Sequence, residues 1–168
     1  TAEDYHCVWY GQCNESVVSK QNCPYNGTAK VVDVEGQPLL KKWCPHFFEV
    51  PGPVKTCCDT NQLKTMDTSI KLAAAFLQRC PSCLQNLIKH ICDFTCGADQ
   101  TRFVEVKEIK LNEATGKEYI NEIDVYIGDA YLNGTYDSCK QVFVPSTGQL
   151  ALDMMCGDWG ASRCSPKK

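Results

Sequence analysis

The stretch RCPSCLQNLIKHICDFTC, residues 79–96, holds side chains that can perform redox chemistry or bind a metal ion. It contains Cys80, Cys83, Cys92 and Cys96, with His90 between the second and third of them. Cys80-Pro-Ser-Cys83 has the C-x-x-C spacing of thiol oxidoreductases, in which a helix dipole makes the first cysteine an attacking thiolate. Three interpretations follow: a redox centre, a zinc site, or disulfides that hold the domain together.

Disulfides are favoured over the other two interpretations by the surroundings of this motif. Thiol oxidoreductases place the C-x-x-C in a βαβ scaffold, whereas here a helical pattern precedes it. Zinc needs four converging ligands, commonly from paired C-x-x-C or histidine motifs. The chain has a single C-x-x-C, and its other cysteines are Cys57-Cys58 and isolated ones. His90 is more typical of a surface or half-buried histidine than of a ligand.

Composition places the chain in an oxidising compartment. Thirteen cysteines in 168 residues are rarely kept reduced in a cytosol. Three N-glycosylation sequons, at Asn14, Asn26 and Asn133, also indicate the secretory pathway. A net charge of −3 offers no basic surface for nucleic acid. The acidic and aromatic first residues are not a signal peptide, so we expect a processed N-terminus.

No membrane span is predicted, and residues 1–168 are interpreted as one domain. The longest apolar run, residues 72–77, is six residues long, while a span needs about 20. We interpret the chain as a single luminal domain that is truncated at its C-terminal end.

Two helices follow the glycine- and proline-rich first 58 residues, which we expect to form loops and short elements, including a short helix in residues 36–44. Apolar residues recur at helical spacing after Asp59, and Asp59 with Gln62 forms a D-x-x-Q capping box. We predict a helix over residues 60–79. Pro81 suits the first turn of a second helix.

The pattern then changes to that of strands. Val104 and Val106 alternate, a slip at Lys107-Glu108 indicates a bulge, and residues 112–117 form a turn before a second strand that includes Ile123. Helical segments are predicted again over residues 130–142 and 149–157. The fold class is therefore α+β: helices packed against a small sheet that contains an antiparallel hairpin.

Several motifs together resemble a known family. CVWYGQC, NCPYNG, CCDTNQL, RCPSCLQNL, HICDFTC and LDMMCG occur in the order and spacing of the N-terminal luminal domain of the Niemann–Pick type C sterol transporters. The similarity runs from about Cys7 to Cys164. It implies a distant, folate-receptor-like fold. It also implies a domain that binds cholesterol and related sterols in a deep apolar pocket, with the 3β-hydroxyl innermost.

The resemblance implies six disulfides: Cys7–Cys57, Cys13–Cys23, Cys44–Cys92, Cys58–Cys96, Cys83–Cys139 and Cys156–Cys164. Cys80 is left over, because its partner in the family lies downstream of the position of Lys168. A helix and a Pro-Phe loop that partly close the family's pocket are also expected beyond Lys168, so the pocket of this fragment should be more open.

The resemblance also implies site residues. Asn22 and Gln62 match the positions that bind the sterol hydroxyl. Without the resemblance, the sequence pattern would favour a turn role for Asn22 and a helix-capping role for Gln62. We expect the Gln62 side chain to bind the ligand, which leaves Asp59 to cap the helix alone. Gln12 matches a water-mediated contact at which several family members carry Glu, which puts in doubt any pH dependence that a carboxylate would bring. Trp9, Met66 and Ile91 match the pocket wall, although the last two also fit plain core.

The pocket entrance is implied at Met154 and Met155, with Phe103 and Gln100 nearby, where the family docks a small soluble luminal sterol carrier. The implied setting is the lumen of the late endosome or lysosome, with the cell surface as alternative, as part of a polytopic membrane protein. No cofactor is expected, and no enzyme, since Glu122 and Asp124 face outward on an alternating strand. The alternatives are a vitamin-binding domain of folate-receptor type and a receptor ectodomain without a small ligand.

Overall fold

The computed structural model describes residues 5–15, 20–77 and 80–126. These residues form helices and short antiparallel sheets joined by disulfides, so the predicted α+β class is confirmed. The chain divides into two compact units, one of residues 1–67 with 91–126 and one of residues 68–90 with 127–168. Every predicted sterol-binding residue lies in the first unit, which the following paragraphs mainly describe.

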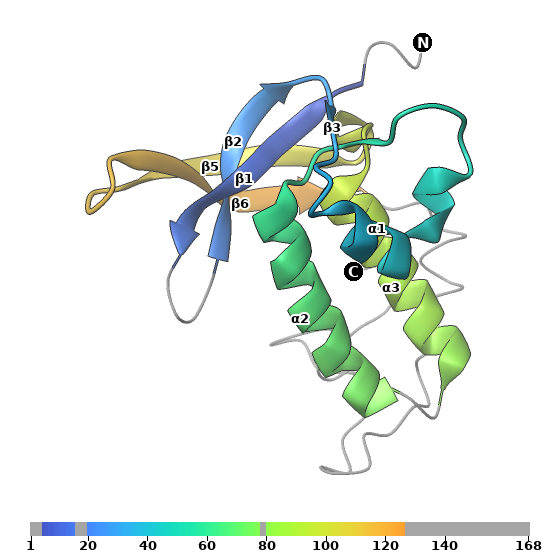
Figure 1. The fold of residues 1–168 in the computed structure, drawn as a ribbon. Helices are drawn as coiled ribbons and strands as arrows, with labels where there is room; N and C mark the ends of the chain where they lie inside the picture. The colour runs from blue at the N-terminus through green and yellow to red at the C-terminus, as the bar shows by residue number, and fades with distance from the viewer. Residues whose placement is uncertain (1–4, 16–19, 78–79, 127–168) are drawn as a thin grey trace. The chain divides into compact units, whose positions relative to one another are not determined.

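Two antiparallel hairpins form the sheet part of the first unit (Figure 1). Strand β1 (Cys7–Glu15) pairs with β2 (Lys20–Gly27), and β5 (Val104–Asn112) pairs with β6 (Lys117–Val125). The predicted slip is confirmed, since the β5–β6 register shifts on both sides of Glu108. The second strand begins at Lys117, earlier than its apolar alternation indicated.

The β1–β2 hairpin corrects the prediction that the first 58 residues form only loops and short elements. Its strands are nine and eight residues long. Three register shifts interrupt the pairing, and Gly11, which adopts φ 82°, lies within the second of them, between Trp9 and Gln12. At each shift one strand has an extra residue relative to its partner, so the pairing is irregular over the length of the hairpin.

The predicted helices are present. Helix α2 (Thr60–Leu77) follows Asp59, and α3 (Pro81–Cys96) begins at the predicted proline. Helix α1 (Gln37–Trp43) confirms the short helix, and 3-10 turns η2 (Pro45–Phe48) and η3 (Gln100–Arg102) complete the helical part. None of the helices in the described ranges is long and apolar enough to cross a bilayer. The helical segments predicted over residues 130–142 and 149–157 lie outside the described residues.

Two further strands, β3 (Lys30–Val31) and β4 (Lys55–Thr56), pair in a separate small ladder. This ladder brings the segment after β2 next to the segment that leads into α2. It therefore helps to set the start of α2.

A small apolar core lies between the two hairpins and the end of α3. Trp9, Val104 and Ile120 are its buried members. The Trp9 ring meets Phe94 edge to face at 5.1 Å between centroids, and Trp9 Nε1 donates to the Thr95 carbonyl at 3.0 Å. A buried indole N–H is thereby satisfied, as a tryptophan in a core requires.

Four of the six implied disulfides are confirmed: Cys7–Cys57, Cys13–Cys23, Cys44–Cys92 and Cys58–Cys96. Cys83 is also disulfide-bonded, and its implied partner Cys139 lies outside the described residues, as do Cys156 and Cys164. Adjacent Cys57 and Cys58 are joined to β1 and to the end of α3, so the segment before α2 is anchored on two sides.

The disulfides should contribute unequally to stability. Cys44–Cys92 joins residues 48 apart and Cys13–Cys23 residues 10 apart. A longer closed loop removes more conformational entropy from the unfolded chain, within a range of about 2–4 kcal/mol for typical disulfides. We expect Cys44→Ala with Cys92→Ala to lower the free energy of unfolding by about 1 kcal/mol more than Cys13→Ala with Cys23→Ala. Urea unfolding of both double variants measures the difference, and equal losses would contradict this account.

Candidate functional site

The Gln62 carboxamide joins two elements. Gln62 is 2% exposed in the first turn of α2. Its Oε1 accepts from the Asp59 N–H at 3.0 Å and from the Gly11 N–H of β1 at 2.7 Å. In return, Asp59 Oδ1 accepts from the Gln62 N–H at 2.8 Å, which completes a reciprocal capping box. The expectation that Asp59 caps alone is therefore wrong, because the Gln62 side chain takes part in the cap.

The other end of the same carboxamide is unsatisfied. Gln62 Nε2 is buried and has no hydrogen-bond partner in the part of the chain that the structure describes. Leaving a buried donor unpaired costs about 1–3 kcal/mol, so such groups are few in native proteins. Gln62 therefore performs its capping role with the oxygen and keeps the N–H₂ group for another partner.

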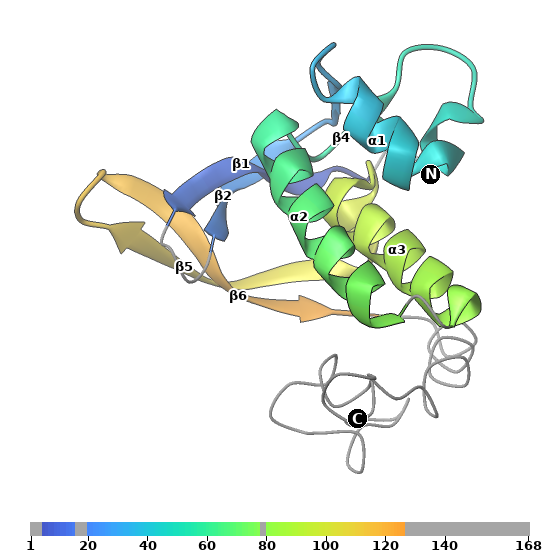
Figure 2. The ribbon, with the colours of Figure 1, turned by 60° about the horizontal axis from the view of Figure 1, so that its bottom comes forward.

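Gln12 directly follows Gly11 on β1, and Asn22 lies on β2. They are Cα partners across the two strands. Gln12 Nε2 donates to Thr65 Oγ1 of α2 at 2.8 Å, so β1 contacts α2 through both Gly11 and Gln12. Figure 2 shows this arrangement, with the first turns of α2 beside β1. Gln12 and Asn22 are both half-buried.

Asn22 also borders a small cavity between β1, β2, β6 and α3. The cavity has a volume of about 160 Å³, and its apolar walls come from Trp9, Phe94, Ile120 and Ile123. The polar side chains of Lys20, Gln21, Asn121 and Glu122 line it together with Asn22, whereas Gln62, Gln12, Met66 and Ile91 do not line this cavity. Met66 is buried on α2 and Ile91 is half-buried on α3. Each predicted wall residue is thus at least half-buried in the first unit.

The residues predicted at the entrance are in different settings. Gln100 is fully buried: its Oε1 accepts from the Val8 N–H at 3.0 Å, and its Nε2 donates to the carbonyls of Phe94 and Thr95, each at 3.1 Å. It joins β1 to the end of α3, a role that no sequence pattern signalled. Phe103 is half-buried against the Trp9 core. Met154 and Met155 lie outside the described residues, and the entrance assignment stays a prediction.

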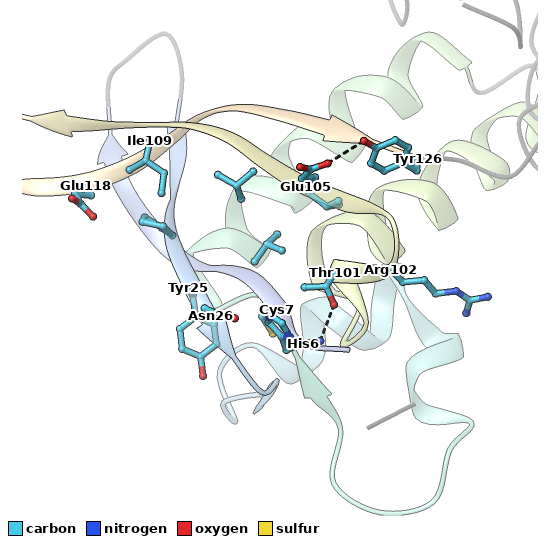
Figure 3. Close-up of a pocket in the computed structure, with 14 residues that line it drawn as sticks. His6, Cys7, Tyr25, Asn26, Thr101, Arg102, Glu105, Ile109, Glu118 and Tyr126 are labelled. Carbon is cyan, nitrogen blue, oxygen red and sulfur yellow. Dashed lines mark hydrogen bonds between the residues drawn. The ribbon is translucent and has the colours of Figure 1, made fainter. Parts of the chain in front are cut away.

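A second, larger groove of about 790 Å³ lies between the start of β1, the end of β2, η3 and β5 (Figure 3). At its edges His6 N donates to Thr101 Oγ1 at 3.1 Å, and Tyr126 OH donates to Glu105 Oε2 at 3.0 Å. None of the predicted sterol-binding residues lines this groove.

The described sequons differ in exposure. Asn26 is exposed beside this groove. Asn14 is half-buried and hydrogen-bonded to Gln21 and Asn112. Asn133 lies outside the described residues. Glycosylation at the three sites stays a prediction.

Cys80 and Cys83 are not arranged as a redox pair. Cys83 is in a disulfide whereas Cys80 is not, so Cys83 is bonded to a cysteine other than Cys80. The Cys80 thiol lies 3.8 Å from Ser82 Oγ. Within the described ranges no three acidic, cysteine or histidine side chains are grouped as a metal site requires.

Three charged residues, Lys30, Asp33 and Asp59, lie near Tyr10 of β1. Lys30 Nζ is 4.3 Å from the centre of the Tyr10 ring and 5.0 Å from that of Tyr25. Burial, followed by the nearby Asp33 and Asp59, raises the pKa of Tyr10. The phenol therefore stays neutral.

The comparisons with known proteins agree on one family. The sequence model of the family described as "Niemann-Pick C1 N terminus" matches residues 4–168. The chain is 37% identical over 156 residues to the NPC intracellular cholesterol transporter 1 of Sus scrofa, covering 90% of this chain and 12% of that protein. It is 27% identical over 171 residues to the NPC1-like intracellular cholesterol transporter 1 of Homo sapiens, covering 97% of this chain and 12% of that protein. The chain thus spans only about an eighth of the length of these relatives.

Gly11 should be required for the contact between β1 and α2. Its φ of 82° is unfavourable for any residue with a Cβ, by about 1–2 kcal/mol. Gly116 in the β5–β6 turn has φ 71° and open space around it, so Gly116→Ala is a matched control for the backbone cost. We expect Gly11→Ala to lower the free energy of unfolding by about 1 kcal/mol more than Gly116→Ala, because its N–H also leaves Gln62. Denaturant unfolding compares them, and a smaller loss for Gly11→Ala would refute the contact's importance.

Proposed function

Because the chain belongs to the Niemann-Pick C1 N terminus family, we propose that it binds cholesterol and related sterols with the 3β-hydroxyl innermost. It acts as a binding module in sterol transport and not as an enzyme. The relatives that it matches are named as cholesterol transporters, which supports this role.

The unpartnered Gln62 Nε2 is the single observation that carries the proposal. A sterol has one polar group, and burying its hydroxyl without a partner costs about 2–7 kcal/mol. The blind end of a sterol site therefore needs a buried polar group that is not already saturated. Gln62 supplies such a group, and Asn22, which lines a small cavity together with Trp9, supplies a second amide.

Apolar walls supply the affinity. Burial of a sterol's ring system contributes about 25 cal/mol per Å² of apolar surface, before the costs of association. Trp9, Met66 and Ile91 form the wall in this proposal. Of the proposed site residues, Trp9 and Asn22 line the cavity of about 160 Å³, and in this proposal Gln12 contacts the hydroxyl through a water molecule.

The proposed setting is the lumen of the late endosome or lysosome. There the domain receives sterol from a small soluble luminal carrier that docks at Met154 and Met155, with Phe103 nearby, and passes it toward the membrane; Gln100, which is fully buried, supports this region from inside. The remainder of a polytopic membrane protein is the further partner. The relatives, of which this chain covers about 12%, support a longer protein.

Loss of both amides should abolish sterol binding. We expect Asn22→Ala with Gln62→Ala to weaken cholesterol binding by at least about a hundredfold, because the hydroxyl then lacks protein partners. Equilibrium binding of radiolabelled cholesterol measures this, at a temperature where thermal unfolding shows the variant folded. Asn61→Ala, an exposed neighbour on α2, is the control and should bind normally. Unchanged cholesterol affinity in the double variant would overturn the proposed site.

Carrier docking should be separable from sterol binding. We expect Met154→Asp with Met155→Asp to slow cholesterol transfer from the soluble carrier about tenfold or more, since a charge disfavours an apolar contact. Equilibrium cholesterol binding should stay within about twofold of wild type. Stopped-flow transfer with a fluorescent sterol measures the rate, and a normal rate would contradict the docking assignment.

A further inference from the structure

The backbone around Gln62 fixes which atom of its carboxamide is available. The N–H groups of Gly11 and Asp59 can only donate, and both point at the same atom of the Gln62 side chain, at 2.7 and 3.0 Å. That atom must be the carboxamide oxygen. Rotating the amide by half a turn would bring Nε2 against two donors and break both bonds.

The two bonds also hold the side chain in place. One comes from β1 and the other from the residue preceding α2, so the oxygen is held by two separate elements. Gln62 is 2% exposed, which leaves little space for another rotamer. The only group of Gln62 that remains for a ligand is therefore the N–H₂ donor.

We infer that Gly11 and Asp59 are positioning residues which make Gln62 an obligatory donor, so that the site takes 3-ketosteroids as well as 3β-hydroxysterols. This inference rests on the proposed sterol function and concerns the polarity of that site. Gln62 Nε2 requires only that the ligand has an oxygen that accepts a hydrogen bond. A ketone oxygen and a hydroxyl oxygen both accept one. The proton of a hydroxyl ligand is donated to a second protein group and not to Gln62.

Among the described residues none holds the Asn22 amide in one orientation in this way, so Asn22 can serve either ligand. It lies on β2 opposite Gln12, and its amide carries both a donor and an acceptor. With a hydroxysterol, Asn22 accepts the hydroxyl proton. With a ketosteroid, a half-turn of the Asn22 amide offers a second donor.

Three ligands on the purified wild-type chain test the inference: cholesterol, the matching 3-ketosteroid, and the matching sterol without oxygen at C3. We expect the ketosteroid to bind within about tenfold of cholesterol, and the deoxy compound about ten- to a hundredfold more weakly than the ketosteroid, because it leaves Nε2 unpaired. If cholesterol binds but the ketosteroid is as weak as the deoxy compound, the group facing the ligand is an acceptor and the inference is wrong. If cholesterol does not bind, the proposed function fails first.

A matched pair of variants tests the role of Gln62 itself. Gln62→Glu keeps two oxygens for the capping box but, when ionised, has no donor. We expect it to weaken ketosteroid binding at least about tenfold more than cholesterol binding, since cholesterol can still donate to the carboxylate. Asn22→Ala removes one hydrogen bond from either ligand, so it should change the ketosteroid-to-cholesterol ratio by less than about threefold.

A pH profile gives a readout that a merely structural role of Gln62 would not move. A buried carboxyl titrates at raised pH, and once protonated it donates as Nε2 does. Ketosteroid binding by Gln62→Glu should therefore recover as the pH falls. A constant ketosteroid-to-cholesterol ratio across the titration would overturn the assignment. If this variant does not fold, the three-ligand series on the wild-type chain decides alone.

Discussion

The Gln62 carboxamide oxygen joins the sheet to the helical part of the first unit at the start of α2. It accepts one N–H from β1 and one from the residue before α2. For this, β1 must present Gly11 with its N–H turned toward the helix, which requires a positive φ and interrupts the strand pairing. The irregular β1–β2 hairpin and the cap of α2 therefore depend on the same acceptor, the Gln62 oxygen.

Disulfides hold the surroundings of this interaction in place. Cys57 and Cys58 lie only a few residues before Gln62 and are bonded to Cys7 at the start of β1 and to Cys96 at the end of α3. The first turn of α2 is thus tied covalently to the same strand that its side chains contact. Because disulfides limit the unfolded chain, a segment rich in glycine and proline can be rigid without a large core of its own. Gln100 adds a third link, since its amide holds β1 to the last turn of α3.

How far the sequence predicts this structure depends on whether a feature is local. The α2 and α3 helices were predictable because their apolar spacing, capping box and first-turn proline act within a few residues. The β5–β6 hairpin and its bulge were predictable from alternation that changes phase at Lys107-Glu108. The β1–β2 hairpin was not, because repeated register shifts remove its alternation and Pro24 lies within a strand.

The site was also predictable only where its contacts are local. A capping box in the sequence tells that Gln62 and Asp59 are near each other, but not that a further N–H comes from Gly11, 51 residues away. The disulfide pairs followed from family resemblance and not from spacing, because cysteine spacing alone leaves many pairings open.

An unpaired donor in a buried position makes the ligand-free domain less stable than it needs to be. In the proposed function the ligand oxygen removes this cost, so part of the binding free energy is the relief of a penalty that the fold already carries. A carboxylate or an ammonium group at the same position would impose a much larger desolvation cost and would titrate. Gln62, Asn22 and Gln12 have no proton to gain or lose in the range from neutral to endosomal pH. The hydrogen-bonding polarity of the site is thus set by backbone geometry and not by the pH of the compartment.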